Sequence, residues 1–371
     1  MPEVHAILSA SSSKRWLNCT PSARLEQNFP NESSVYAEEG TAAHALGEYK
    51  LRKYLHERVK RPTSEYEDEE MEANTDIYAE FIISTVERIK ETCPHPLVMV
   101  EERLDYSYLV PSGFGTGDCV IIADGTLYVM DYKNGKGVFV NCDHNPQMML
   151  YALGAYHAYG YLYSIKKVSM TIIQPRLENI STFECSVEEL LDWAETYVRP
   201  RAKLAFEGKG EQVPGDWCRF CRARTSCKAC AAEAMALVKE EFLDLDAGVL
   251  EEETEETDAT ASFDPDTSVP TFKSPALLSK TDIEKMLPTL NRIESWIEAI
   301  FAYVSSEAIN HGVSWDGYKV VEGRSKRQFL DTKSVVAAAE KAGYTDIYKT
   351  ELISLTAFEK LMGKKKFQEI L

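Results

Sequence analysis

Long hydrophobic runs are missing from this sequence. The chain has 371 residues and no stretch that approaches the roughly 18 consecutive apolar residues needed to span a bilayer, which excludes a membrane anchor. Its first 17 residues contain no continuous apolar segment and include Lys14 and Arg15, so we do not expect a secretory signal. The nine cysteines are therefore expected in a reducing compartment, where metal ligation is favoured over disulfides.

Basic residues are absent from two acidic segments. Residues 240–266 contain 12 acidic side chains and no Lys or Arg, and residues 65–80 contain another 8 acidic ones and none that is basic. These segments account for the net charge of −18, because the remainder carries 39 acidic and 41 basic residues. A polyanionic ligand such as nucleic acid is therefore not excluded by the acidic composition of the chain.

Composition divides the chain into three parts. Residues 236–275 combine a run of glutamates with prolines and few large apolar side chains, so they cannot offset the entropy of folding and are predicted to form a flexible linker. Residues 1–235 and 276–371 are predicted to fold. The acidic residues 65–80 are interpreted as an exposed loop that leads into a helix.

Periodicity predicts an α/β fold for the first part. Short β-branched or aromatic runs are typical of strands at residues 97–104, 118–123, 126–133 and 167–174. Helical spacing occurs at residues 41–55, 76–91, 146–161 and 187–207. This alternation indicates a central sheet covered by helices on both sides. For the last part we expect a smaller α+β module, with helices at residues 279–310, 332–342 and 355–363 and a strand pair within 315–330.

A predicted hairpin places two carboxylates opposite each other. The Asp-Gly pair at residues 124–125 is a strong signal for a two-residue type I′ turn, and it sets Asp118 against Asp131 on one face of the sheet. Lys133 shares that face. Opposed like charges destabilise a sheet unless a cation lies between them, which favours a Mg²⁺ or Mn²⁺ site beside an ammonium group. In the alternative interpretation both aspartates lie at strand ends in solvent, with Lys133 as an ion-pair partner.

Four short motifs resemble the PD-(D/E)XK nuclease superfamily, and within it the RecB-like branch. They are Gly-Thr-Ala-Ala-His at residues 40–44, Gly-Thr-Gly-Asp at 115–118, Asp-Tyr-Lys-Asn-Gly at 131–135, and the pair formed by Gln147 and Tyr151. The resemblance implies a restriction-endonuclease-like core with a central mixed sheet. The spacing of Gln147 and Tyr151 puts both on one helix face.

The resemblance also implies roles for these residues. Asp118 and Asp131 would hold the metal together with His44, and Lys133 would assist catalysis. Gln147 and Tyr151 would line the DNA-binding side of the site. Three nearby glutamates are interpreted as surface or supporting residues rather than ligands: Glu48, Glu101 and Glu102.

A set of cysteines at the two ends of the first part resembles the iron–sulfur staple of RecB-like nucleases, including AddB-type and CRISPR-associated members. The set is Cys19, Cys218, Cys221 and Cys227, and it implies a [4Fe–4S] cluster. A zinc site would instead use Cys230 with the C-terminal trio and leave Cys19 unexplained. The sequence departs from the family at Thr20, which separates Cys19 from Pro21.

The whole arrangement resembles phage-encoded proteins with this nuclease domain and an uncharacterised C-terminal module. It implies a metal-dependent DNA exonuclease that acts in phage DNA recombination or processing. Its expected partners are DNA and a phage single-strand annealing protein, and its expected location is the cytoplasm of an infected or prophage-carrying bacterium. The alternative is a catalytically silent iron–sulfur protein that binds DNA or acts as an inhibitor on the same fold.

Overall fold

The computed structural model describes residues 6–30, 34–233, 280–321 and 332–344, together with residues 347, 358, 361, 362, 366 and 367. The chain divides into two compact units, Met1–Glu307 and Ala308–Leu371. The predicted linker at residues 236–275 lies outside the described residues, so the three-part division of the chain stays a prediction. No helix in the described part of the chain has the length and apolar character that crossing a membrane requires.

One mixed sheet organises the first unit. Its five strands lie in the order of the sequence: β1 (Leu97–Asp105), β2 (Phe114–Ala123), β3 (Thr126–Tyr132), β4 (Lys167–Gln174) and β5 (Asn179–Ser186). Neighbouring strands are antiparallel except β3 and β4, which run parallel. A parallel pair needs a crossover connection, and helix α5 (Pro146–Tyr159) provides it.

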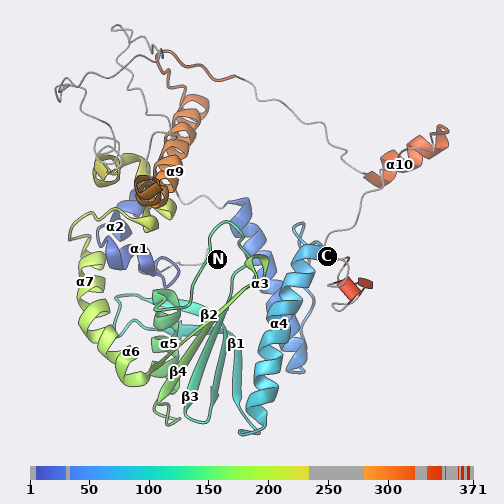
Figure 1. Cartoon of the computed structure of the whole chain (residues 1–371), viewed down its shortest axis with the longest axis vertical. Helices are drawn as coiled ribbons and strands as arrows, with labels where there is room; N and C mark the ends of the chain where they lie inside the picture. Colours follow the sequence, from blue (N-terminus) through green and yellow to red (C-terminus); the bar gives the residue numbers. More distant parts are fainter. Residues whose placement is uncertain are drawn as a thin grey trace, which may run out of the picture. The chain divides into compact units, whose positions relative to one another are not determined.

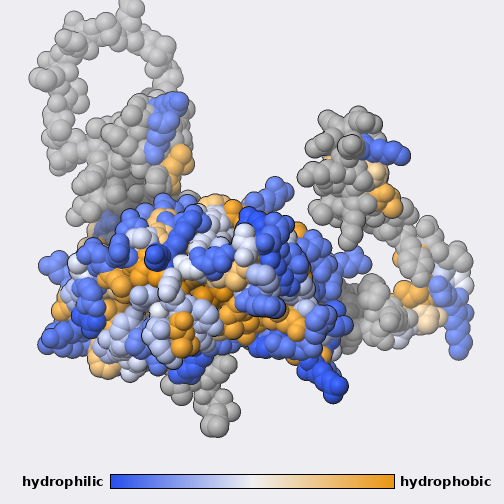
Figure 2. Space-filling model, turned by 90° about the horizontal axis from the view of Figure 1, so that it is seen from below, coloured by the Kyte–Doolittle hydropathy of each residue, from blue (hydrophilic) through white to orange (hydrophobic). Residues whose placement is uncertain are grey.

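Helices cover both faces of this sheet (Figure 1). On one face lie α3 (Val35–Tyr54) and α4 (Glu69–Lys90), and on the other lie α5, α6 (Val187–Trp193) and α7 (Arg199–Glu207) with the short α1 (Ser13–Asn18) and α2 (Ser22–Leu25). Each face has its own hydrophobic core. Figure 2 shows apolar residues in a band across the lower face of the molecule, between hydrophilic flanks. The predicted α/β class, with a mixed sheet flanked by helices, is confirmed.

Successive side chains of strand β2 alternate between the two hydrophobic cores. Val120 and Ile122 are buried in the core beneath α5, whereas Cys119 and Ile121 are buried beneath α3 and α4. A strand covered on both faces reads as a continuous apolar run, which is the pattern of residues 119–123. Asp118 directly precedes this run, beyond the last residue of β2 that pairs with β3.

The acidic segment at residues 65–80 leads from a loop into a helix as expected, but the helix starts seven residues before the predicted residue 76, so residues 69–75 are helical. Helix α4 begins at Glu69, and the Asp68 side chain caps it by accepting the backbone N–H of Met71 at 2.7 Å. Glu70 and Glu72 lie with Glu69 in the first turn. Carboxylates are favourable there because the helix dipole places partial positive charge at its N-terminus.

Two further differences concern residues 179–207, which follow β4. Strand β5 was not expected, because it is an edge strand whose side chains alternate between partly buried and exposed and offer few apolar positions. The single helix expected over residues 187–207 is interrupted by a π-helical turn, Ala194–Val198, between α6 and α7. Such turns are often found at functional sites.

The predicted helices that follow are present as α9 (Lys280–Asn310) and α10 (Thr332–Lys341). The strand pair expected within residues 315–330 is absent from its described part, residues 315–321. A turn occupies this position, with the Tyr318 N–H donating to the Trp315 carbonyl and Gly317 at a left-handed φ of 78°. The remainder of that pair, and most of the helix expected at residues 355–363, lie outside the described residues.

Candidate active site

The site begins at the hairpin of β2 and β3. Asp124 and Gly125 have φ values of 47° and 70°, as a type I′ turn requires, and the pairing of Val120 with Val129 confirms the predicted register. The ladder ends one step before the two aspartates. Beyond it, Oδ2 of Asp118 accepts the backbone N–H of Tyr132 at 2.7 Å. Asp118 and Asp131 therefore occupy adjacent strand ends, and both are buried.

Asp118 pairs with an imidazole from helix α3. Nδ1 of His44 lies 3.2 Å from Oδ1 of Asp118, and the His44 ring rests edge-on against Tyr132 at 5.4 Å between ring centres. Burial lowers the pKa of His44, but the charge and hydrogen bond of Asp118 outweigh it and raise the pKa to about 9. His44 and the Tyr132 N–H in turn hold the pKa of Asp118 below its usual range against the effect of burial.

Asp131 lies beside the ammonium group of Lys133. Nζ of Lys133 is 2.7 Å from Oδ2 of Asp131, yet this oxygen is fully buried and receives no hydrogen bond of good geometry. Burial raises the pKa of Asp131, and the nearby charge of Asp118 adds to this effect while Lys133 opposes it. The contact that Oδ2 of Asp131 makes with the protein is thus an ion pair with Lys133.

Gln147 connects these groups at the start of α5. The Asn145 side chain caps the helix by accepting the Gln147 N–H at 3.0 Å. Oε1 of Gln147 accepts from Lys133 at 3.1 Å, and Nε2 donates to Asp131 and to the Tyr151 hydroxyl, each at 3.2 Å. Tyr151 is buried behind Gln147, so the predicted pair lies on one helix face but only Gln147 reaches the open side of the site.

Gly115 allows Tyr151 to take this position. A Cβ atom at Gly115 would stand 2.6 Å from the Tyr151 ring, closer than van der Waals contact permits. The glycine of the 115–118 motif therefore lets the tyrosine pack directly against the backbone of β2.

Glu101 belongs to the site, although sequence reasoning left it outside. Val100 pairs with Cys119 and Glu102 with Gly117, so Glu101 stands opposite Asp118, with a left-handed φ of 54°. One ligand atom each of His44, Glu101 and Asp118 lies within 4.8 Å of the others. Burial, and secondarily the charge of Asp118, raises the pKa of Glu101 to about 7.

These donors fit a divalent metal ion. Carboxylate oxygens are the ligands that Mg²⁺ and Mn²⁺ prefer, and an imidazole nitrogen favours the softer Mn²⁺. Among the described residues, only the His44, Glu101 and Asp118 group brings three potential ligand atoms this close together. Asp131, whose Oδ2 pairs with Lys133, adds a fourth candidate donor at the same end of the sheet.

Two side chains at the end of β4 and just after it fix the loop that follows Lys133. The buried Gln174 amide donates to the carbonyls of Gly135 and Val138 and accepts the Val140 N–H. Arg176 donates to both oxygens of Glu70 at 3.0 Å, to Glu39 at 2.6 Å and to the Asn134 carbonyl at 3.4 Å. Arg176 thus links the loop to α4 and to α3, the helix that carries His44.

The predicted cysteines meet although they are about 200 residues apart in the sequence. Five of them line one small cavity: Cys19, Cys218, Cys221, Cys227 and Cys230. Residues near both ends of the first predicted part, 1–235, are also joined by hydrogen bonds from Thr20 to the Lys209 carbonyl at 2.6 Å and from the Arg222 N–H to Glu26 at 2.9 Å. None of the nine cysteines, which all lie among the described residues, forms a disulfide.

The sulfur spacing bears on the choice between a cluster and zinc. Burial raises the pKa of the Cys19 thiol. Burial, together with the charge of Glu26, raises the pKa of the Cys221 thiol to about 12. A zinc ion at about 2.3 Å from each sulfur would hold its thiolates within roughly 4 Å of one another. No three of the described cysteine sulfurs lie within 4.8 Å of one another, so these thiols are not gathered as closely as a bound zinc ion would hold them.

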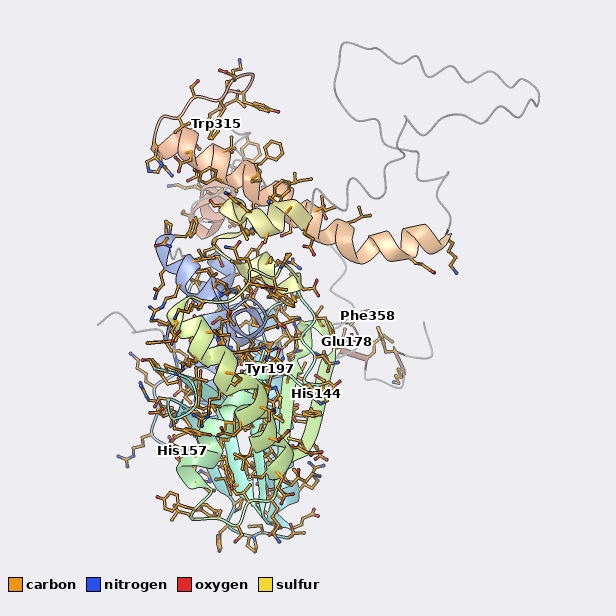
Figure 3. The ribbon with its side chains drawn as sticks, turned by 90° about the vertical axis from the view of Figure 1, so that its left-hand side faces the viewer. His144, His157, Glu178, Tyr197, Trp315 and Phe358 are labelled. Carbon is orange, nitrogen blue, oxygen red and sulfur yellow. The ribbon has the colours of Figure 1, made fainter. Side chains whose placement is uncertain are left out.

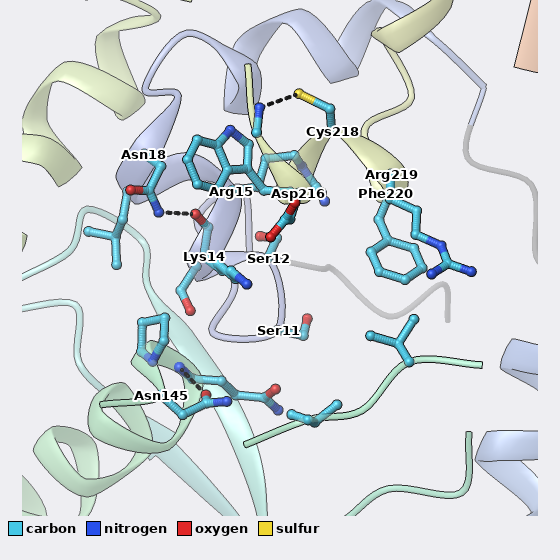
Figure 4. A pocket seen from close by; sticks show the side chains of 18 of the residues that line it. Ser11, Ser12, Lys14, Arg15, Asn18, Asn145, Asp216, Cys218, Arg219 and Phe220 are labelled. Carbon is cyan, nitrogen blue, oxygen red and sulfur yellow. Dashed lines mark hydrogen bonds between the residues drawn. The ribbon is translucent and has the colours of Figure 1, made fainter. Parts of the chain in front are cut away.

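Lys133 and Gln147 open onto a second, much larger cavity of about 1030 Å³. In Figure 4 its walls include the N-terminal segment with Ser11, Ser12 and Lys14, the start of α5 at Asn145, and Arg219 and Phe220 from the cysteine-rich segment. The candidate metal ligands thus lie behind Lys133 and Gln147 at one end of a space large enough for an extended ligand.

Comparisons with known proteins give a family but no activity. Among solved structures, the crystal structure of SSO0001 matches 57% of this chain and 95% of its own, at 15% sequence identity and a TM-score of 0.22. A family model matches residues 5–371, almost the whole chain. The chain therefore belongs to the family described as protein of unknown function (DUF2800).

Proposed function

We propose that this protein is a metal-dependent nuclease of the PD-(D/E)XK superfamily, RecB-like branch, which hydrolyses phosphodiester bonds in DNA. The observation that carries the proposal is the convergence of Asp118, Asp131 and Lys133 at adjacent strand ends, with Lys133 facing a cavity of about 1030 Å³. Buried like charges are costly, and a site that keeps two of them beside an ammonium group is typical of metal-assisted hydrolysis.

His44, Glu101, Asp118 and Asp131 would hold a Mg²⁺ or Mn²⁺ ion. When bound, the ion would supply an activated water and neutralise charge on the phosphate. Oε1 of Gln147 accepts a hydrogen bond from the Lys133 ammonium at 3.1 Å, and Nε2 of the same amide donates to the Tyr151 hydroxyl at 3.2 Å. Lys133 can therefore present its remaining protons to a phosphate oxygen and stabilise the charge that develops there.

The direct test is cleavage of end-labelled DNA by the purified full chain with Mn²⁺, using linear and circular substrates in single- and double-stranded form. Asp131→Asn and Lys133→Ala should each lower cleavage at least about a hundredfold. Asp192→Asn is the matched control, because Asp192 is exposed and lines neither the cavity nor the ligand group. Full cleavage by Asp131→Asn would refute the assignment. No cleavage by the wild-type chain would favour the silent DNA-binding alternative.

We also propose that Cys19, Cys218, Cys221 and Cys227 bind a [4Fe–4S] cluster that joins the two ends of the nuclease domain. Four thiolates lining one cavity fit such a group, and a link across about 200 residues constrains a long loop. Protein purified without oxygen should be brown and contain iron and acid-labile sulfide in similar amounts.

The two variants that separate the metals are Cys19→Ala and Cys230→Ala. With a cluster, Cys19→Ala should lose iron and stability, whereas Cys230→Ala should keep both. The opposite pattern, with stoichiometric zinc and no sulfide, would show that the site is a zinc module formed by the C-terminal cysteines.

A further inference from the structure

The large cavity beside Lys133 is richer in positive charge than the chain that forms it. Its charged lining residues are five basic and three acidic: Lys14, Arg15, Lys133, Arg219 and Arg224 against Asp143, Asp216 and Glu233. Two of the basic groups are paired outside the lining, Arg15 with Glu26 and Lys133 with Asp131. The whole chain has 41 basic and 59 acidic residues. Lys14 and Arg219 are exposed, and Figure 4 shows them on separate walls. This charge pattern suits a ligand with several phosphates.

Two phenylalanines project into the same space. Phe139, on the loop that follows Lys133, is 61% exposed, and Phe220, in the cysteine-rich segment, is 62% exposed. The Arg219 guanidinium lies 5.8 Å from the centre of the Phe220 ring. Exposed aromatic rings that line a basic cavity offer flat surfaces on which nucleobases can stack.

A third aromatic surface lies where α6 meets α7. The rings of Trp193 and Tyr197 line the cavity and are nearly parallel, with an interplanar angle of 18° and centres 6.3 Å apart. The Arg201 guanidinium lies 3.8 Å from the centre of the Tyr197 ring. The π-helical turn Ala194–Val198 places Tyr197 here, and Figure 3 shows Tyr197 on the same side of the molecule as His144, another cavity residue.

We propose that this cavity binds single-stranded DNA and leads the strand to Lys133 and Gln147, with bases stacked on Phe139 and Phe220 and on the Trp193 and Tyr197 surface. The role of the bound strand as substrate rests on the nuclease proposal, whereas its binding does not. The strand is single because both faces of a base in a duplex are already covered by its neighbours. Only an unstacked base can contact these rings.

Binding is measured separately from cleavage, in EDTA, by fluorescence anisotropy with the full chain. The probes are a labelled dT oligomer of about 12 nucleotides, within the range of sites on single strands, and a blunt duplex of equal length. Phe139→Ala and Phe220→Ala should each weaken binding to the oligomer about tenfold, as expected for the loss of one base stack. Both side chains are exposed, so the melting temperature should not change.

Two controls make the test specific. Phe220→Tyr keeps the ring and should bind as the wild type does. Tyr161→Ala removes an aromatic side chain that is 81% exposed but does not line the cavity, and it should have no effect. Equal binding of duplex and oligomer, or wild-type binding by both alanine variants, would overturn the inference. If the wild type binds the oligomer but cleaves no DNA with Mn²⁺, the nuclease proposal fails and the binding site stands.

Discussion

Replacement of Arg176 by alanine should destabilise the protein by about 2–3 kcal/mol at neutral pH. The Arg176 side chain is 11% exposed and donates two hydrogen bonds to Glu70 and one to Glu39. Glu39 is 24% exposed, so its charged hydrogen bond contributes about 1.5–2 kcal/mol. Glu70 is 54% exposed, and solvent screening reduces its pair with Arg176 to about 0.5–1 kcal/mol.

The effect should depend on pH with a definite sign. The hydrogen bonds from Arg176 lower the pKa of Glu70 below its ordinary value of 4.5. A carboxylate with a lowered pKa stabilises the fold above its unfolded-state pKa and loses this contribution as the pH falls through its folded-state pKa. The cost of Arg176→Ala should therefore be full at about pH 7 and smaller at about pH 3.

Urea unfolding of the wild-type and variant chains at both pH values measures this difference. Arg199→Ala is the matched control, because Arg199 pairs with Glu195 at an exposed i, i+4 position and should cost less than about 0.5 kcal/mol. A melting temperature lowered by roughly 4–10 °C should accompany the loss in Arg176→Ala. A cost below about 0.5 kcal/mol at pH 7, or an equal cost at both pH values, would refute the reasoning.

Three further outcomes are expected. Gly115→Ala should lower kcat for DNA cleavage with little change in KM. The added Cβ would stand 2.6 Å from the Tyr151 ring and would displace the Gln147 amide, which donates to the Tyr151 hydroxyl. Wild-type kinetics would contradict this. Glu101→Gln should weaken Mn²⁺ binding at least about tenfold by calorimetry, and unchanged affinity would remove Glu101 from the ligands. Gln174→Leu should cost about 2–3 kcal/mol and speed amide hydrogen exchange at residues 135–140, whereas unchanged protection would show that the loop is held by other contacts.

Local signals in the sequence were sufficient for the centre of the site. The Asp-Gly turn at residues 124–125 fixes the register of its hairpin, because a two-residue turn leaves no freedom in strand pairing. That register brings Asp118 and Asp131 together. Helical spacing likewise places Gln147 and Tyr151 on one face of α5. Residues close in sequence are therefore positioned by rules of local geometry.

Long-range packing decided the rest. Glu101 joins Asp118 through the pairing of β1 with β2, whose connection at residues 106–113 is too long to fix a register from the sequence. Strand β5 has few apolar residues, so its sequence does not stand out as a strand. The π-helical turn that places Tyr197 has no periodic signal of its own. Cys19 and Cys218 approach each other only because α1, α2 and α7 pack together at one end of the fold. The sequence determined the residues that carry chemistry within each element, whereas the tertiary structure decided which elements meet, because such contacts depend on packing between segments far apart in the chain.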